Sequence, residues 1–169
     1  MKKIVCLLAL FCAMNAWAQK VEIAVAGSWA EIPAQQTQSE LKPGWKIVDY
    51  QLKSRLTHYL SGGRASQLAE GFQPVFRITP GSEEVLVDYA LIQLKRYKSY
   101  RKLPQALLIE NVYTRLEPKD FDIKAESDAF ICQPRLPLKP GEYILVNLSQ
   151  HPIGELQDLL VYPFCVMKQ

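Results

Sequence analysis

The 169-residue chain combines 20 Lys and Arg residues with 17 Asp and Glu residues. Two of the cations, Lys2 and Lys3, precede an N-terminal apolar run, and without them the positive residues outnumber the negative ones by one. A nearly neutral chain lacks the excess positive charge that general nucleic-acid binding requires. The chain is also long enough to bury a core without a structural metal.

The first 18 residues have the pattern of a secretory signal peptide. The two lysines are followed by an apolar stretch over residues 4–14, and then by the small residues Ala16 and Ala18 at the positions that a leader peptidase reads. The apolar stretch is shorter than the roughly 20 residues that span a bilayer. We therefore expect cleavage after Ala18, export to the periplasm or the exterior, and a single mature domain over residues 19–169.

In chain order, the mature part is predicted to consist of β-strands and loops, because no long window has a helical period. The polar stretch 31–44 is expected to be an exposed connection, and residues 64–70 to form one or two helical turns closed by Gly71. Pro163 within the last strand indicates an edge or a bulge. Alternation and short apolar runs predict strands at residues 21–26, 45–52 or 45–60, 75–78, 84–95, 107–116, 121–123, 129–132, 143–148 and 159–166.

One segment, Leu138–Val146, carries an L-x-P-G-x-Y motif followed by an apolar strand. It resembles the start of the penultimate strand in immunoglobulin-like and prealbumin-like β-sandwiches. The resemblance implies a two-sheet Greek-key sandwich in which the Tyr143 hydroxyl bonds backbone a few residues upstream. By position, Gly141 would supply a permissive backbone and Leu138 would cap the core. The motif covers about nine residues and concerns the fold, not an activity.

Two cysteines, Cys132 and Cys165, remain once Cys6 and Cys12 leave with the leader. An even pair in an oxidising compartment favours a disulfide. Two buried thiols are the alternative, because free cysteine is also a common core residue. A catalytic cysteine is the least favoured interpretation, since no histidine lies near either cysteine in the sequence.

The local concentration of cations between residues 94 and 102 is the candidate binding segment. It could hold an anionic partner by charge pairing and tyrosine stacking, or it could be the charged end of a hairpin that discourages edge pairing. In a continuous strand, Lys95 and Arg101 would face opposite to Arg96, Lys98 and Lys102, which argues against a single basic face. The candidate binding residues are Lys95, Arg96, Tyr97, Lys98, Tyr100, Arg101 and Lys102.

Other chemical signals are weaker. His58 and His151 belong to no zinc or metalloprotease motif, and no nucleophile elbow, P-loop or dinucleotide fingerprint occurs. No metal or cofactor is therefore expected. The acidic residues Asp120, Asp122, Glu126 and Asp128 do not have the spacing of an EF-hand loop and are interpreted as a solvated surface. Aromatic residues that could stack on sugars, or fill the core, are Trp29, Trp45, Tyr50, Tyr59, Phe72 and Phe76.

These observations favour a non-catalytic binding or structural module of the bacterial envelope that meets a protein partner. A carbohydrate-binding module with exposed aromatics is one alternative. A hydrolase with Ser, His and Asp brought together from distant positions is another, because such triads are recognised in space. The sequence indicates neither the identity of the partner nor an oligomeric state.

Overall fold

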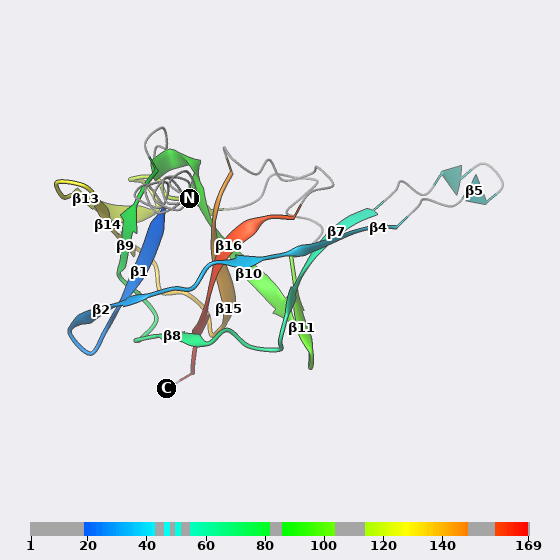
Figure 1. The fold of residues 1–169 in the computed structure, drawn as a ribbon, viewed down its shortest axis with the longest axis horizontal. Coiled ribbons are helices and arrows are strands. Elements are labelled where there is room, and N and C mark those ends of the chain that lie inside the picture. Colours follow the sequence, from blue (N-terminus) through cyan, green and yellow to red (C-terminus); the bar gives the residue numbers. More distant parts are fainter. Residues whose placement is uncertain are drawn as a thin grey trace, which may run out of the picture.

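A computed structural model describes residues 19–42, 46–47, 50–51, 55–81, 86–103, 114–148 and 158–168. The predicted signal peptide lies outside the described residues, as do residues 107–113 of the strand predicted at 107–116. The described part is built from strands that form two packed sheets, with a single 3-10 turn at Leu86–Asp88 (Figure 1). The all-β prediction is therefore confirmed.

The first sheet has five strands in the order β13-β14-β9-β1-β2, and all neighbours are antiparallel. Ala26 and Gly27, both with positive φ (52° and 76°), form the two-residue turn between β1 and β2. Such turns match the twist of the strands they join. The strands are β1 (Lys20–Val25), β2 (Ser28–Glu31), β9 (Phe76–Thr79), β13 (Phe121–Ala125) and β14 (Phe130–Pro134).

The second sheet runs in the order β3-β16-β15-β10-β11-β7-β4, with β12 paired to β10 and β8 paired to β16. Thr37 alone separates β3 from β4, which stand at opposite ends of this order. The sheet therefore nearly closes into a barrel. Its strands are β3 (Gln35–Gln36), β4 (Gln38–Lys42), β7 (Arg55–Ser61), β8 (Gln67–Ala69), β10 (Tyr89–Arg96), β11 (Tyr100–Lys102), β12 (Thr114–Arg115), β15 (Gly141–Asn147) and β16 (Leu160–Val166).

The expectation of an exposed connection at residues 31–44 is wrong, because β3 and β4 lie there. β4 pairs with β7 from Gln38 opposite Tyr59 to Lys42 opposite Arg55. β5 (Lys46–Ile47) and β6 (Tyr50–Gln51) continue the same register, and this hairpin projects away from the sheets (Figure 1). Strand pairing uses backbone groups, so a polar sequence can still form an edge strand.

Three further local predictions need correction. Residues 64–70 contain the strand β8 in place of helical turns, because residues 67–69 pair in parallel with Phe164–Val166 of β16. The strand predicted from residue 84 begins at Tyr89, after the 3-10 turn. Pro163 does not lie in an edge strand, yet β3 pairs only before it and β8 only after it. Its missing N–H thus falls where β16 changes partners.

The core lies on both faces of β10, β15 and β16. Alternation along β10 sends Tyr89 and Leu91 toward the five-stranded sheet, and Ala90 and Ile92 toward the barrel interior. Burial on both faces explains the continuous apolar runs in these strands. The barrel interior also holds Leu60, Leu94, Leu103, Ile144, Val146, Leu159 and Val161, whereas the larger cluster between the sheets includes Val21, Ile23, Phe76, Phe121, Cys132, Tyr143, Leu145, Tyr162 and Phe164.

The L-x-P-G-x-Y segment leads the chain from the five-stranded sheet into β15. The Tyr143 hydroxyl donates a hydrogen bond to the carbonyl oxygen of Lys139 at 2.8 Å, four residues upstream. The predicted backbone bond is therefore present. Leu138 is partly buried against the cluster between the sheets. A Cβ at Gly141, the first residue of β15, would lie 2.8 Å from Nε2 of Gln93, so glycine leaves room for that side chain.

Candidate functional site

The predicted binding segment forms a tight hairpin between β10 and β11. Lys95 is paired with Lys102 and Arg96 with Arg101, and the Tyr97 amide donates to the Tyr100 carbonyl at 2.9 Å. The chain therefore reverses at residues 98 and 99. The face assignment expected for a continuous strand is wrong, because the reversal places Lys95 and Lys102 on one face, and Arg96 and Arg101 on the other.

Three tyrosines and two lysines gather on the outward side of this hairpin. Lys102 is paired with Tyr59 of β7. The Tyr97 and Tyr100 rings stack with centroids 4.5 Å apart, and the Tyr59 ring meets the Tyr100 ring edge-on at 5.5 Å. Nζ of Lys95 lies 5.9 Å from the Tyr97 ring centroid, and Nζ of Lys102 lies 5.7 Å from that of Tyr59. We call these five residues the tyrosine–lysine face.

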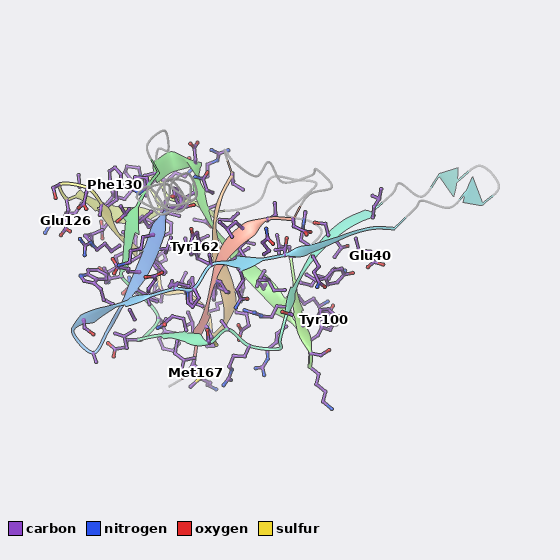
Figure 2. All side chains as sticks on the ribbon, in the orientation of Figure 1. Glu40, Tyr100, Glu126, Phe130, Tyr162 and Met167 are labelled. Carbon is purple, nitrogen blue, oxygen red and sulfur yellow. The ribbon has the colours of Figure 1, made fainter. Side chains whose placement is uncertain are left out.

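Hydrogen bonds and a close backbone approach connect this face to the neighbouring strands. The Tyr59 hydroxyl donates to Oε2 of Glu40 at 3.1 Å, and Glu40 and Tyr100 are labelled on the same side of the molecule in Figure 2. The Gly62 amide donates to the Ser99 carbonyl at 3.0 Å. A Cβ at Gly63 would lie only 2.4 Å from the Lys98 carbonyl oxygen, so glycine is needed for this close approach. The hairpin turn is thus fixed against β7 and the segment that follows it.

Arg101 is a correction to the predicted binding set, because it is buried on the inner face with 1% of its surface exposed. Its Nε donates to the Gly62 carbonyl at 3.1 Å, and its Nη2 donates to the Ser61 carbonyl at 3.1 Å and to Oε1 of Gln35 at 3.2 Å. Its Nη1 lies 3.6 Å from Oε2 of Glu142, which is equally buried. Burial lowers the pKa of Arg101, and Glu142 opposes that shift. Arg101 therefore holds strands together and does not meet a partner.

His58 is the described residue that bears on the hydrolase alternative. Its Nδ1 lies 3.0 Å from Oγ of Ser39, and the Ser39 amide donates to Oδ1 of Asp158 at 2.9 Å. However, the His58 side chain is fully buried, and its Nε2 has no hydrogen-bond partner among the described residues. A catalytic base needs access to substrate. His151 lies outside the described residues.

His58 predicts a loss of stability on acidification. Burial lowers its pKa, and Asp158 opposes that shift. The unfolded state, with an ordinary histidine pKa near 6.5, therefore binds the proton more readily than the folded state does. We expect the urea midpoint to fall as the pH drops through about 6.5, and to fall less in the His58→Asn variant. His151→Asn is the control for the second histidine, and equal pH dependence in wild type and His58→Asn would contradict the prediction.

The expected disulfide is not formed, because Cys132 and Cys165 are free, buried thiols. Cys132 belongs to the cluster between the two sheets. Cys165 is paired with Glu142, and alternation places it opposite to Phe164 and Val166, which face that cluster. The two sulfurs therefore lie on different sides of β16. Burial raises the pKa of Cys132 to about 12, and burial and the neighbouring Glu142 raise that of Cys165 to about 11.

These thiols are expected to resist alkylation in the native protein. At neutral pH almost none of either cysteine is thiolate, which is the reactive form. With iodoacetamide and no reductant, the intact mass of the mature protein (residues 19–169) should show little labelling while it is folded and two additions once guanidinium unfolds it. If the unfolded protein takes up label only after reduction, the two cysteines form a disulfide and the prediction of free thiols is wrong.

The aromatic and acidic residues that the sequence offers as further candidates do not come together at one site among the described residues. Phe76 is fully buried and Phe72 partly buried, whereas Trp29 is 39% exposed on the edge strand β2. Trp45 and the side chain of Tyr50 lie outside the described part. Asp122 pairs with Arg135 at 2.9 Å, and Glu126 lies 3.8 Å from Arg77. Among the described residues, no group of three or more His, Cys, Asp or Glu side chains could hold a metal ion.

The sequence does not assign Tyr59 or Glu142 to a site. Tyr59 is one of several aromatic residues in the sequence, and its place beside the hairpin depends on β7 pairing with β11. Glu142 lies within the L-x-P-G-x-Y segment, whose resemblance concerns the fold. A carboxylate at the start of a strand that is otherwise apolar was the signal available, because buried charges require partners.

No protein-family model, curated protein or solved structure matches this chain. In the part of the chain that the structure describes, no helix is long and apolar enough to cross a membrane. Fold and site together define an all-β protein of two packed sheets, whose β10–β11 hairpin presents tyrosines and lysines at the surface.

Proposed function

We propose that the chain is an exported, non-catalytic module of the bacterial envelope that binds a protein partner through the tyrosine–lysine face. The observation that carries the proposal is the turn at residues 98 and 99, which brings Tyr97 and Tyr100 together with Tyr59 beside two lysines. Tyrosine is enriched at binding hot spots because it offers a large, rigid contact area with a polar tip. The lysines favour a partner with an acidic surface.

A protein partner fits this face better than a sugar does. Sugar stacking requires an accessible ring face. The Tyr97 ring already stacks on Tyr100 and has the Lys95 ammonium near it, and the Tyr59 ring has the Lys102 ammonium near it. A sugar would have to displace these contacts, whereas an acidic protein surface can pair with the lysines and contact the exposed edges.

Export rests on the sequence pattern of residues 1–18, with two lysines, an apolar stretch and the Ala16 and Ala18 cleavage positions. We propose the periplasm or the exterior as the location of the mature protein. The prediction can be checked by N-terminal sequencing of the protein from the periplasmic fraction, which is expected to begin at Gln19.

For the fold we propose the immunoglobulin-like or prealbumin-like Greek-key type. Strands β1, β9, β14 and β13 lie side by side as strands A, B, E and D do in an immunoglobulin domain, and β10, β15 and β16 lie as C, F and G do. The chain order of the seven strands agrees with this assignment. The bond from Tyr143 to Lys139 at the start of β15 supports it, since it has the position of the tyrosine corner.

Site-specific photo-crosslinking in cells tests the proposed function. A benzoylphenylalanine at position 97 should yield a discrete adduct with one envelope protein, and the same probe at Lys124, exposed on β13, should not. Charge reversal by Lys95→Glu and Lys102→Glu together should abolish the adduct, because it removes the attraction to an acidic surface. An adduct that survives charge reversal, or that forms equally at position 124, would contradict the proposal.

A further inference from the structure

A cavity of about 700 Å³ opens where β10 and β16 end and β15 begins, near the C-terminus. Met167, one of its lining residues, is labelled at this end of the molecule in Figure 2. Sites for small ligands commonly have volumes in this range. The cavity is separate from the tyrosine–lysine face, apart from Lys95, which borders both.

Positive charge dominates the described lining of the cavity. Arg64, Lys95, Arg96 and Lys168 contribute four cations, and Glu142 is the one carboxylate. The charge of Glu142 is already matched by Arg101, whose Nη1 lies 3.6 Å away. The Cys165 thiol, which also lines the cavity, keeps its proton at neutral pH. The net field in the cavity therefore attracts anions.

A buried acceptor oxygen in the lining of the cavity indicates that the ligand must also carry a hydrogen-bond donor. Glu142 is 1% exposed, its Oε2 accepts from the Ala65 amide at 2.8 Å, and the Cys165 thiol forms a hydrogen bond with the same carboxylate. Its Oε1 has no hydrogen-bond partner among the described residues. A buried oxygen without a partner is costly in a folded protein, and it can be satisfied by a ligand that donates a hydrogen bond. Because the four cations around it repel an ammonium group, a neutral hydroxyl is the suitable donor.

We propose that this cavity binds a small hydroxylated anion, namely a sugar or polyol that carries a carboxylate or a phosphate. The anionic group pairs with Arg64 and Lys168 at the exposed rim, where guanidinium and ammonium form charge-assisted hydrogen bonds. A hydroxyl of the same molecule donates to Oε1 of Glu142. This site goes beyond the proposed protein-binding function, since its ligand and most of its residues are different.

Titration calorimetry at constant ionic strength tests the proposal with four probes: glucuronate, glycerol 3-phosphate, sulfate and glucose. At least one of the two hydroxylated anions is expected to bind about tenfold or more tightly than sulfate, which has no hydroxyl donor, and than glucose, which has no charge. Comparison of glucuronate with glycerol 3-phosphate distinguishes a carboxylate from a phosphate ligand. Failure of both to bind, or equal binding of sulfate, would overturn the proposal.

The variant Arg64→Gln/Lys168→Gln locates the binding. Both residues are exposed, so the fold should survive, and affinity for the bound probe should fall about tenfold or more through the loss of two charge-assisted bonds. Lys124→Gln on β13 is the matched control and should leave the affinity unchanged. Unaltered affinity in the double variant would place the binding elsewhere. Crosslinking from position 97 should persist in it, so the two functions can fail independently.

Discussion

Replacing Arg101 with methionine, while Glu142 is kept, is expected to lower the free energy of unfolding by about 3–5 kcal/mol. The substitution removes the buried ion-pair partner of the Glu142 carboxylate, since both side chains are 1% exposed and Nη1 of Arg101 lies 3.6 Å from Oε2 of Glu142. It also removes the donors to the carbonyls of Ser61 and Gly62. The loss can be measured by guanidinium unfolding at neutral pH.

The double variant Arg101→Met/Glu142→Leu isolates the ion pair from the other contacts of Arg101. Exchange of both partners of a buried pair for apolar residues is often close to neutral. Here recovery should be partial, because the Ala65 amide then loses its acceptor, and two carbonyls still lack donors. The double variant should therefore be more stable than Arg101→Met alone. A loss below about 1 kcal/mol in Arg101→Met would mean that water solvates the pair.

The strands that the sequence predicts best are those with apolar residues. Alternation and continuous apolar runs located most of β1, β9, β10, β13, β14, β15 and β16, because these strands bury their side chains in a core. The tyrosine bond at position 143 was also predictable, since the motif and the bond are local. It joins residues only four positions apart.

Elements that depend on a distant partner were beyond prediction. β3 and β4 consist largely of polar residues, and β8 is only three residues long. They are strands because β16 and β7 offer backbone groups to pair with. Arg101 looked exposed within a basic run, because nothing nearby in sequence reveals Glu142 as its partner. The prediction of a disulfide was wrong for a similar reason. Parity of cysteines carries no information about which face of β16 holds Cys165.

For the candidate site, composition located the hairpin, but its geometry depended on one turn. The position of the reversal at residues 98 and 99 decides which cations share a face. No turn residue such as proline or glycine marks it in the sequence. Close approach of Gly63 to the Lys98 carbonyl helps to fix the turn, and that contact joins segments about 35 residues apart.

Replacing Phe164 with alanine is expected to cost about 3–5 kcal/mol, because the cavity left behind lies between the two sheets. The Phe164 ring is fully buried and meets the Phe76 ring of the opposite sheet at 5.1 Å. It also stacks on the Tyr143 ring at 5.6 Å, beside the bond that anchors the start of β15. The substitution thus removes apolar contacts within its own sheet and across to the other. Guanidinium unfolding followed by tryptophan fluorescence and by circular dichroism measures the loss.

Leu68→Ala on the adjoining strand β8 is the matched control, because Leu68 is 41% exposed and its truncation should cost no more than about 0.5 kcal/mol. Phe164→Leu retains most of the buried volume and should lose much less stability than Phe164→Ala. A double-mutant cycle that combines Phe164→Ala with Tyr143→Ala should give a coupling free energy of about 0.5–1.5 kcal/mol for the stacked rings. If Phe164→Ala costs no more than Leu68→Ala, then the two sheets do not share the core that these ring contacts define.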